Sequence, residues 1–254
     1  MLDGKKIIVV MPARNVEKTL EQTVTSMPSN VADAIILVDN RSHDHTCEIA
    51  ERLGLHVIRH DHDRGYGGSQ KTCYSEALKL GADVVVMLHP DGQYPPGKLI
   101  DVARLVTQGQ CDLGLGSRIL GGGAMRRGMP LYKFFSNRML THIENLCLGL
   151  RLSEYHTGYR AFSREFLLRV PFMKNSDDFL FDNQIIVQAV VFGFRIAEVS
   201  TPTVYTEEST SVPFFGSVAY GLGVLWTSME FLLHRWHMIQ SSRFHPNEVT
   251  GYSS

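Results

Sequence analysis

One stretch of sequence decides the fold class, and it is a short apolar run that ends abruptly in polar residues. It reads Asp83-Val84-Val85-Val86-Met87-Leu88-His89-Pro90-Asp91-Gly92-Gln93. An unbroken run of valine and leucine is typical of a parallel strand that helices cover on both faces. The strand is expected to end near Leu88, so Asp91 and Gln93 would lie just beyond its carboxyl end.

The same pattern recurs on both sides of this stretch. Further apolar runs that predict strands lie at residues 7–11, 34–38, 56–60 and 112–116. Helical spacing of apolar residues separates these runs, as at Leu99, Val102 and Val106. Strands that alternate with helices predict an α/β fold with a parallel sheet and crossover helices. A glycine-rich loop at residues 64–68 is expected to lead into a helix capped by Ser69.

The second half of the chain is less regular. Residues 118–130 form a basic, glycine-rich loop, and helical patterns follow at 131–149 and 179–192, with a late strand at 194–199. No linker or repeat separates two bodies, so we expect one domain over residues 1–240. Its halves would be residues 5–117 and 118–240, with a flexible tail at 241–254.

The overall charge argues against a nucleic-acid partner. The 254 residues include 25 Lys and Arg and 26 Asp and Glu, which gives a net charge of −1. Such a chain lacks the basic field that binds a phosphate backbone. Four widely spaced cysteines and an apolar N-terminal run too short for a signal peptide favour the cytoplasm.

One long segment without formal charge, residues 209–229, bears on membrane contact. Together with the residues after it, this segment carries apolar side chains on one helical face. They are Phe214, Val218, Leu222, Leu225, Met229, Leu232 and Trp236. We expect a helix packed on the core, with peripheral attachment to the inner face of a membrane as the second interpretation and a membrane span as the third.

Polar residues follow four of the expected strands, and ligands of open α/β sheets bind at that edge. Asp39, Asp91 and Gln93 offer hard oxygen ligands suited to Mg²⁺ or Mn²⁺, which would bridge the phosphates of a nucleotide diphosphate. The alternative is that Asp39 and Asp44 are only turn and cap residues, and that Asp91 only belongs to a turn. The glycine-rich loop has neither dinucleotide-binding nor P-loop spacing.

The chain resembles the family 2 glycosyltransferases of the GT-A fold, near the dolichyl- and polyprenyl-phosphate sugar synthases. The segments that carry the resemblance extend from the first strand to the late strand. They are Val9 to Asn15, Ile36 to Thr46, Arg64 to Gly68, Asp91 to Pro96, Gly116 to Arg118, Thr157 to Phe162, Phe181-Asp182 and Arg195 to Val199. The resemblance implies a Rossmann-like mixed sheet flanked by helices, and an inverting transfer of a hexose from a GDP- or UDP-sugar to an acceptor such as polyprenyl phosphate.

The resemblance also implies roles for particular residues. Catalytic roles fall to Asp182, which would face the acceptor, and to Arg118 and Arg160, which would meet phosphates. The metal would be held by Asp91, Gln93 and His89. Substrate contacts are expected from Pro12, Ala13, Asn15, Asp39, Gly65, Asp91, Arg118, Arg126 and Arg127. The basic pair Arg126-Arg127 has a solvated loop as its alternative, and His156 a purely structural role.

Some residues depart from the family pattern. His89 replaces the first acid of the metal motif, and Thr206-Glu207-Glu208 stand where the prenyl-phosphate enzymes carry basic residues. A non-catalytic nucleotide-sugar-binding protein of the same fold is therefore the alternative function. A nucleotidyltransferase is a third, although the chain lacks the lysine-containing glycine loop such enzymes use against a triphosphate.

Overall fold

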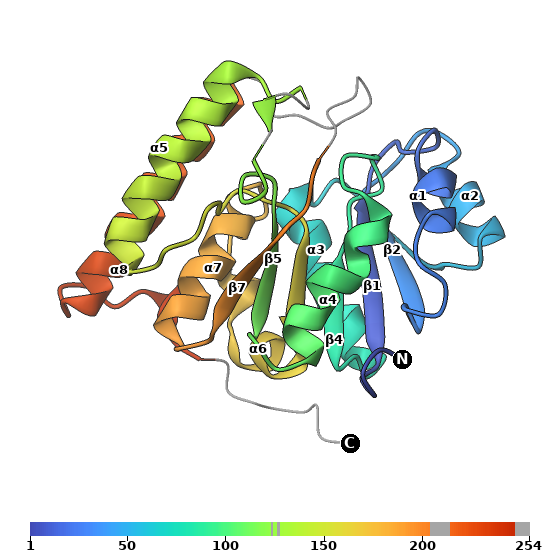
Figure 1. Cartoon of the computed structure of the whole chain (residues 1–254), viewed down its shortest axis with the longest axis horizontal. Helices are drawn as coiled ribbons and strands as arrows, with labels where there is room; N and C mark the ends of the chain where they lie inside the picture. Colours follow the sequence, from blue (N-terminus) through green and yellow to red (C-terminus); the bar gives the residue numbers. More distant parts are fainter. Residues whose placement is uncertain (123, 126–127, 204–213, 247–254) are drawn as a thin grey trace.

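The computed structural model describes residues 1–122, 124–125, 128–203 and 214–246, and its centre is one seven-stranded sheet (Figure 1). The strands lie in the order β3-β2-β1-β4-β6-β5-β7. Their bounds are β1 (Ile7–Ala13), β2 (Ala34–Asp39), β3 (His56–Arg59), β4 (Val84–Met87), β5 (Leu113–Ser117), β6 (Arg160–Ser163) and β7 (Ile196–Ser200). The five strands expected from the first half and the late strand are all present.

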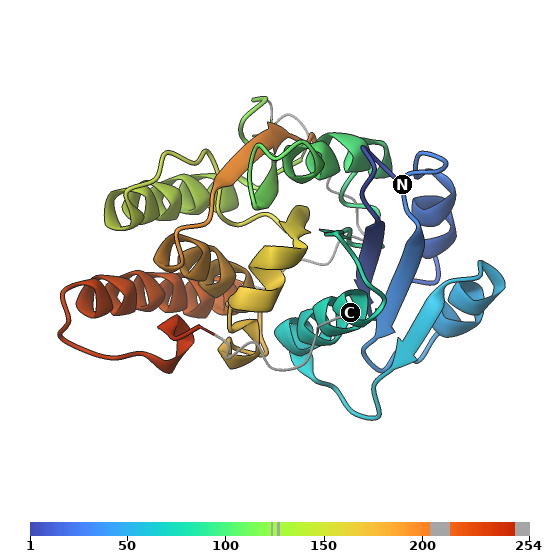
Figure 2. The ribbon, with the colours of Figure 1, turned by 90° about the horizontal axis from the view of Figure 1, so that it is seen from below.

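Helices cover both faces of the sheet, as seen end-on in Figure 2. They are α1 (Leu20–Thr25), α2 (Thr46–Arg52), α3 (Gly65–Lys79), α4 (Leu99–Thr107), α5 (Leu131–Leu148), α6 (Arg164–Arg169), α7 (Phe181–Val191) and α8 (Phe214–Arg235), with 3₁₀ turns η1 (Pro96–Lys98), η3 (Phe172–Lys174) and η4 (Ser242–Phe244). Side chains of β1 alternate between the two resulting cores. Ile8 and Val10 pack with α3, α6 and α7, whereas Ile7 and Val9 pack with α1, α2 and α4.

The sheet is mixed, as the family resemblance implies, because β6 runs antiparallel to both of its neighbours. Its register pairs Val86 with Ala161 and Leu115 with Arg160. All other strand pairs are parallel. The hydrophobic pattern alone predicted only parallel strands and missed both β6 and α6. Strand β6 begins with a charged residue and ends with a polar one, so it has no apolar run, and α6 is six residues long, which is too short for a helical period to emerge.

The glycine-rich segment is not a loop, which corrects the expected helix start at Ser69. Helix α3 begins at Gly65, and the Ser69 hydroxyl donates to the Gly65 carbonyl within the helix. The glycines are needed for close packing against the segment before α7. A Cβ on Gly65 would lie 2.3 Å from the Asp177 carbonyl oxygen, and one on Gly67 would lie 2.3 Å from that of Ser176. Gly65 also has a φ of +72°, which disfavours other residues.

Helices α5 and α8 pack side by side at one end of the molecule (Figure 1). The core-facing residues of α8 include Val224, Thr227, Ser228 and Phe231. The apolar stripe expected to face the core instead points largely outward, which corrects that expectation: Val218, Leu222, Met229 and Trp236 are exposed. No helix in the described ranges is long and apolar enough to cross a membrane.

The first part of the expected flexible tail is packed on the core. Phe244 is buried in the cluster that contains α3 and α7, and Arg243 forms an ion pair with Glu230 at 2.6 Å. The Gln188 amide donates to the Arg243 carbonyl at 3.0 Å. Packing on the core therefore continues to Phe244.

Candidate active site

A cavity of about 910 Å³ opens at the carboxyl edge of the sheet and continues between α5 and α8. Nine of the residues expected at the site line this cavity. They are Pro12, Ala13, Asn15, Gly65, His89, Asp91, Gln93, Arg118 and Asp182. Asp39 and Arg160 do not line it, and Arg126 and Arg127 lie outside the described residues.

Two turns at this edge are locked to each other after β1 and β2. The Asn15 side chain accepts from the His43 backbone N–H at 2.8 Å, and the Ser42 hydroxyl accepts from the Asn15 N–H at 2.8 Å. Asn15 and Arg41 both have a positive φ, 52° and 62°. Side chains with Cβ atoms rarely adopt this conformation unless the surroundings hold them there. The reciprocal hydrogen bonds supply that restraint.

The two aspartates that follow β2 have different surroundings. Asp44 has the structural role that the sequence left open, because its carboxylate accepts from Thr46 and from the Glu17 N–H. Asp39 is buried at the end of β2 and accepts from the Ser42 N–H at 3.2 Å. The neighbouring residue, Asn40, lines the cavity in its place.

The metal motif after β4 offers a small set of ligands. Asp91 is buried in the cavity wall, and its Oδ1 accepts from the Gln93 N–H at 3.0 Å. The described residues contain no group of three or more His, Cys, Asp or Glu side chains arranged to hold a metal. One carboxylate nevertheless suits a divalent ion whose remaining ligands are donor phosphates and water, which is how Mg²⁺ is commonly bound. The imidazole of His89 beside it would add a nitrogen ligand.

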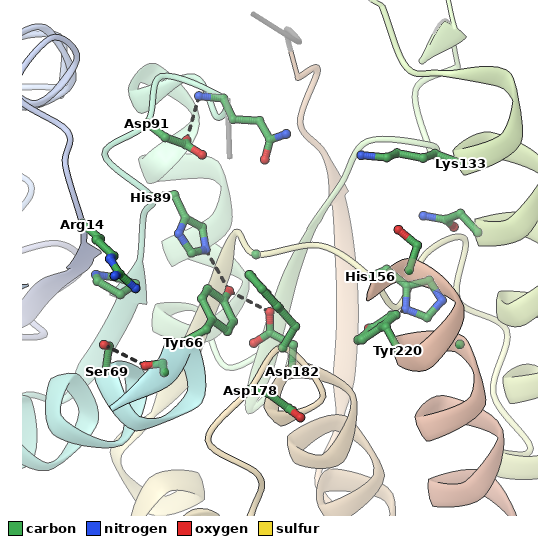
Figure 3. A pocket seen from close by; sticks show the side chains of 18 of the residues that line it. Arg14, Tyr66, Ser69, His89, Asp91, Lys133, His156, Asp178, Asp182 and Tyr220 are labelled. Carbon is green, nitrogen blue, oxygen red and sulfur yellow. Dashed lines mark hydrogen bonds between the residues drawn. The ribbon is translucent and has the colours of Figure 1, made fainter. Parts of the chain in front are cut away.

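A chain of hydrogen bonds links the metal motif to Asp182 (Figure 3). The Tyr66 hydroxyl donates to Asp182 Oδ2 at 2.8 Å and lies 3.0 Å from His89 Nε2. Gln70 donates to the other carboxylate oxygen at 2.8 Å. Burial lowers the pKa of His89 despite the nearby carboxylates of Asp91 and Asp182. Sequence reasoning missed Tyr66, since a tyrosine inside a glycine-rich segment carries no catalytic signal of its own.

Arg118 lies in the cavity wall but is already paired. Its backbone N–H donates to Glu154 Oε2 at 2.7 Å and its Nε to Oε1 at 2.8 Å. Although burial opposes ionisation, this arginine holds the pKa of Glu154 below its ordinary value. Burial and the charge of Arg118 together lower the pKa of Lys133, which also lines the cavity. Because Glu154 balances the charge of Arg118, Lys133 is the group on this wall that would attract an anion.

The prediction that Arg160 contacts phosphate is wrong, because Arg160 is fully buried beneath the site. Its guanidinium donates to the carbonyls of Thr157, Tyr155 and Asp182. A buried arginine with three backbone acceptors positions other residues and does not reach a ligand in the cavity.

His156 belongs to a second polar group on the α8 side of the cavity. Its Nδ1 lies 2.9 Å from the Tyr220 hydroxyl, and its Nε2 lies 3.2 Å from Glu144 Oε2. Glu144 is fully buried on α5 and accepts from the Asn183 amide on α7. The group therefore joins three helices, which supports a structural role, while His156 and Tyr220 also face the cavity.

The cavity changes character along its length. The end near β1 and β4 is polar, whereas the end between α5 and α8 is lined by apolar side chains. These are Met129, Met139, Leu140, Val218, Leu222 and Leu225. The sequence did not reveal this apolar groove, because it is made by two helices that lie far apart in the chain.

Comparison with known proteins assigns the family. The sequence model of glycosyl transferase family 2 matches residues 8–170, more than half of the chain. A mixed sheet with polar residues at the carboxyl ends of its strands defines the GT-A fold as the class of this protein. The chain belongs to glycosyl transferase family 2 and is a glycosyltransferase.

Individual relatives include enzymes named for dolichyl phosphate and polyprenol, the branch that the sequence resembles. An uncharacterized protein of Methanocaldococcus jannaschii is 32% identical over 83% of this chain and 86% of its own length. The UDP-N-acetylglucosamine–dolichyl-phosphate N-acetylglucosaminyltransferase of Methanococcus voltae is 28% identical over 81% of this chain and 88% of its own length. The polyprenol monophosphomannose synthase of Mycolicibacterium smegmatis is 26% identical over 82% of this chain and 80% of its own length.

A solved structure supports the fold. Glucosyl-3-phosphoglycerate synthase from Mycobacterium tuberculosis in complex with UDP aligns with a TM-score of 0.67 and 21% identity, covering 94% of this chain and 82% of that one. The expected GT-A fold is therefore confirmed.

Proposed function

We propose that this protein is an inverting glycosyltransferase that moves a hexose from a nucleotide-diphosphate sugar to polyprenyl phosphate. The observation that carries the proposal is the continuous cavity with a polar donor end and an apolar end between α5 and α8. Lys133 lies in the cavity wall, where the phosphate of a lipid acceptor would need positive charge. A nucleotide sugar would lie among the polar side chains of one end, and a prenyl chain among the apolar side chains of the other.

Each end of the cavity contributes to the transfer. The acceptor phosphate oxygen would attack the anomeric carbon as the bond to the nucleotide diphosphate breaks, which inverts that carbon. A phosphate acceptor is already ionised, so no base is required. Asp182, held by Tyr66 and Gln70, would face the acceptor, and Lys133 would hold the acceptor phosphate. These preorganised groups stabilise charge where it develops.

A divalent metal is part of the proposal. Asp91 and His89, with Gln93 beside them, would hold Mg²⁺ or Mn²⁺, which neutralises charge on the departing diphosphate when it is bound. Solved complexes of the glucosyl-3-phosphoglycerate synthase contain Mn²⁺ or Mg²⁺ together with UDP. The names of the relatives that act on dolichyl and polyprenyl phosphates support the acceptor class.

The outer surfaces of α5 and α8 support peripheral attachment to a membrane. Exposed apolar side chains on these helices include Phe135 and Leu146 on α5 and Trp226 on α8. Each helix contains one carboxylate, Glu144 and Glu230 respectively, and both are buried. An apolar surface without exposed negative charge suits the headgroup region of an anionic bilayer.

A donor and acceptor panel tests the proposal. Release of nucleoside diphosphate would be measured from GDP- and UDP-sugars with Mg²⁺ or Mn²⁺, with polyprenyl phosphate or a lipid extract as acceptor. We expect release that depends on both the metal and the lipid. No turnover on any pair, with calorimetry finding donor binding unaffected by metal, would instead establish a non-catalytic nucleotide-sugar-binding protein.

A further inference from the structure

The hydroxyl of Tyr66 occupies a position that the proposed reaction does not explain. It is the one group that touches both the metal motif, through His89, and Asp182 among the described residues. Its ring stacks with those of His89 and Phe179, at centroid separations of 5.5 and 4.6 Å. These two contacts hold the phenol ring, and with it the position of the hydroxyl oxygen.

The hydrogen-bond donors and acceptors around Tyr66 determine which ring nitrogen of His89 carries the proton. A tyrosine hydroxyl carries one proton, and a carboxylate can only accept. Asp182 is surrounded by donors, because Gln70 donates to Oδ1 and the Arg160 guanidinium lies 3.5 Å away. The Tyr66 proton is thus directed to Asp182 Oδ2. The Tyr66 oxygen must then accept from His89, which places the imidazole proton on Nε2.

The second ring nitrogen is consequently unprotonated. Nε2 and Cδ2 are turned toward Gly158, where a Cβ would approach them to 2.5 and 2.7 Å, so the ring cannot be displaced to that side. Nδ1 lies on the other edge of the ring and makes no hydrogen bond to any residue that the structure describes. His89 lines the cavity together with Asp91.

We propose that Tyr66 is a positioning residue that holds His89 as the Nε2–H tautomer and so offers Nδ1 to the donor site as a nitrogen ligand for Mn²⁺ in preference to Mg²⁺. Histidine ligands of metals generally donate their other N–H to an acceptor that fixes the tautomer, and loss of that acceptor weakens the metal site. Mg²⁺ is a hard ion that takes oxygen ligands almost exclusively, whereas Mn²⁺ accepts an imidazole nitrogen beside its oxygen ligands. The inference rests on the proposed nucleotide-sugar function.

Metal binding tests the ligand directly. Calorimetry would measure Mn²⁺ and Mg²⁺ affinity in the presence of UDP or GDP for the wild type, His89→Asp, Tyr66→Phe and Tyr74→Phe. We expect Tyr66→Phe to weaken Mn²⁺ binding about tenfold, and His89→Asp to reduce the preference for Mn²⁺ over Mg²⁺ by a similar factor. Tyr74→Phe removes another buried hydroxyl of α3 that does not reach His89 and should leave the preference unchanged.

The tautomer is tested independently by ¹⁵N NMR of the histidine rings, assigned by comparison with His89→Asp. We expect the Nε2–H form in the wild type and a mixture of forms in Tyr66→Phe. An Nδ1–H form in the wild type, or an unchanged metal preference in His89→Asp, would overturn the inference. If neither nucleoside diphosphate binds, the proposed function fails, while the NMR result still decides whether Tyr66 fixes the ring.

Discussion

Arg160 supports Asp182 from below: its Nη1 donates to the Asp182 carbonyl at 2.6 Å and lies 3.5 Å from Oδ1 of the same residue. Arg160 is fully buried, while Asp182 faces the cavity. The pair joins strand β6 to the first turn of α7. Arg160, which the family resemblance placed in contact with phosphate, thus stabilises the site from within the protein.

Replacing Arg160 should destabilise the fold. Arg160→Leu would leave three carbonyls and the Asp182 carboxylate without their buried partner, a change that typically costs about 3–5 kcal/mol. The free energy of unfolding in urea measures this loss. The matched control is Arg52→Ala, which removes an exposed ion pair with Glu21 and should change stability by no more than about 0.5 kcal/mol. Equal effects would contradict a supporting role for Arg160.

Replacing Asp182 should affect turnover more than donor binding. Asp182→Asn keeps the shape of the side chain but removes the charge that Tyr66 and Gln70 orient. We expect kcat to fall about 100-fold, as on loss of one preorganised electrostatic contact, with the donor Kd little changed. Steady-state kinetics and calorimetry separate the two. A parallel loss of donor affinity would place Asp182 in the donor site.

Replacing Asp91 should abolish activity with little loss of stability. Asp91→Ala removes the carboxylate of the metal motif, whereas residues at a loop edge contribute little to the core. We expect a fall in kcat/KM of at least about 100-fold, and the same loss on chelation of the metal with EDTA. Thermal unfolding provides the check on folding, since a variant that unfolds where the wild type is folded would refute this placement.

Acid should destabilise the protein partly through His60. Burial, and then the charge of Arg64, lower the pKa of His60 in the folded chain. The unfolded chain therefore takes up a proton near pH 6.5 and the folded chain only at lower pH, so stability is lost as the pH falls through that interval. Urea unfolding at pH 7.5 and 5.5 should reveal a smaller acid loss in His60→Gln than in the wild type. His142→Gln, which changes an exposed histidine of α5, should retain the wild-type loss.

Membrane attachment should depend on exposed apolar residues of α5 and α8. The double variant Leu146→Ser/Trp226→Ser removes two of them, which are 72% and 61% exposed. Because each would bury apolar surface in the bilayer, we expect sedimentation with anionic vesicles to weaken at least about tenfold. Met173→Ser changes a similarly exposed residue outside both helices and should bind as the wild type does. Equal binding of all three proteins would argue against this surface.

The parts of the fold that were predictable are those with a strong local pattern. The buried run at Val84–Met87 and the helical spacing around Leu99 locate β4 and α4 from sequence alone. Strand β6 was not predictable, because its four residues form a strand only through pairing with β4 and β5 on either side. Long-range pairing of this kind leaves no local periodicity.

The site was predictable to a similar extent. Motif spacing identified Asp91 and His89, which do line the cavity. It also identified Arg160, yet a motif reveals that a residue is required and not whether its side chain faces ligand or protein. The apolar groove and the role of Tyr66 depend on contacts between segments far apart in sequence, such as the 116 residues that separate Tyr66 from Asp182.

The position of β6 restricts how the enzyme can release its products. Since β6 of the acceptor half lies between β4 and β5 of the donor half, backbone hydrogen bonds join the two halves in one continuous sheet. The two halves consequently have no hinge line along which they could separate as rigid lobes. Release of the products must therefore depend on local movement of the surface segments around the cavity mouth, and the rate of turnover would be sensitive to substitutions there.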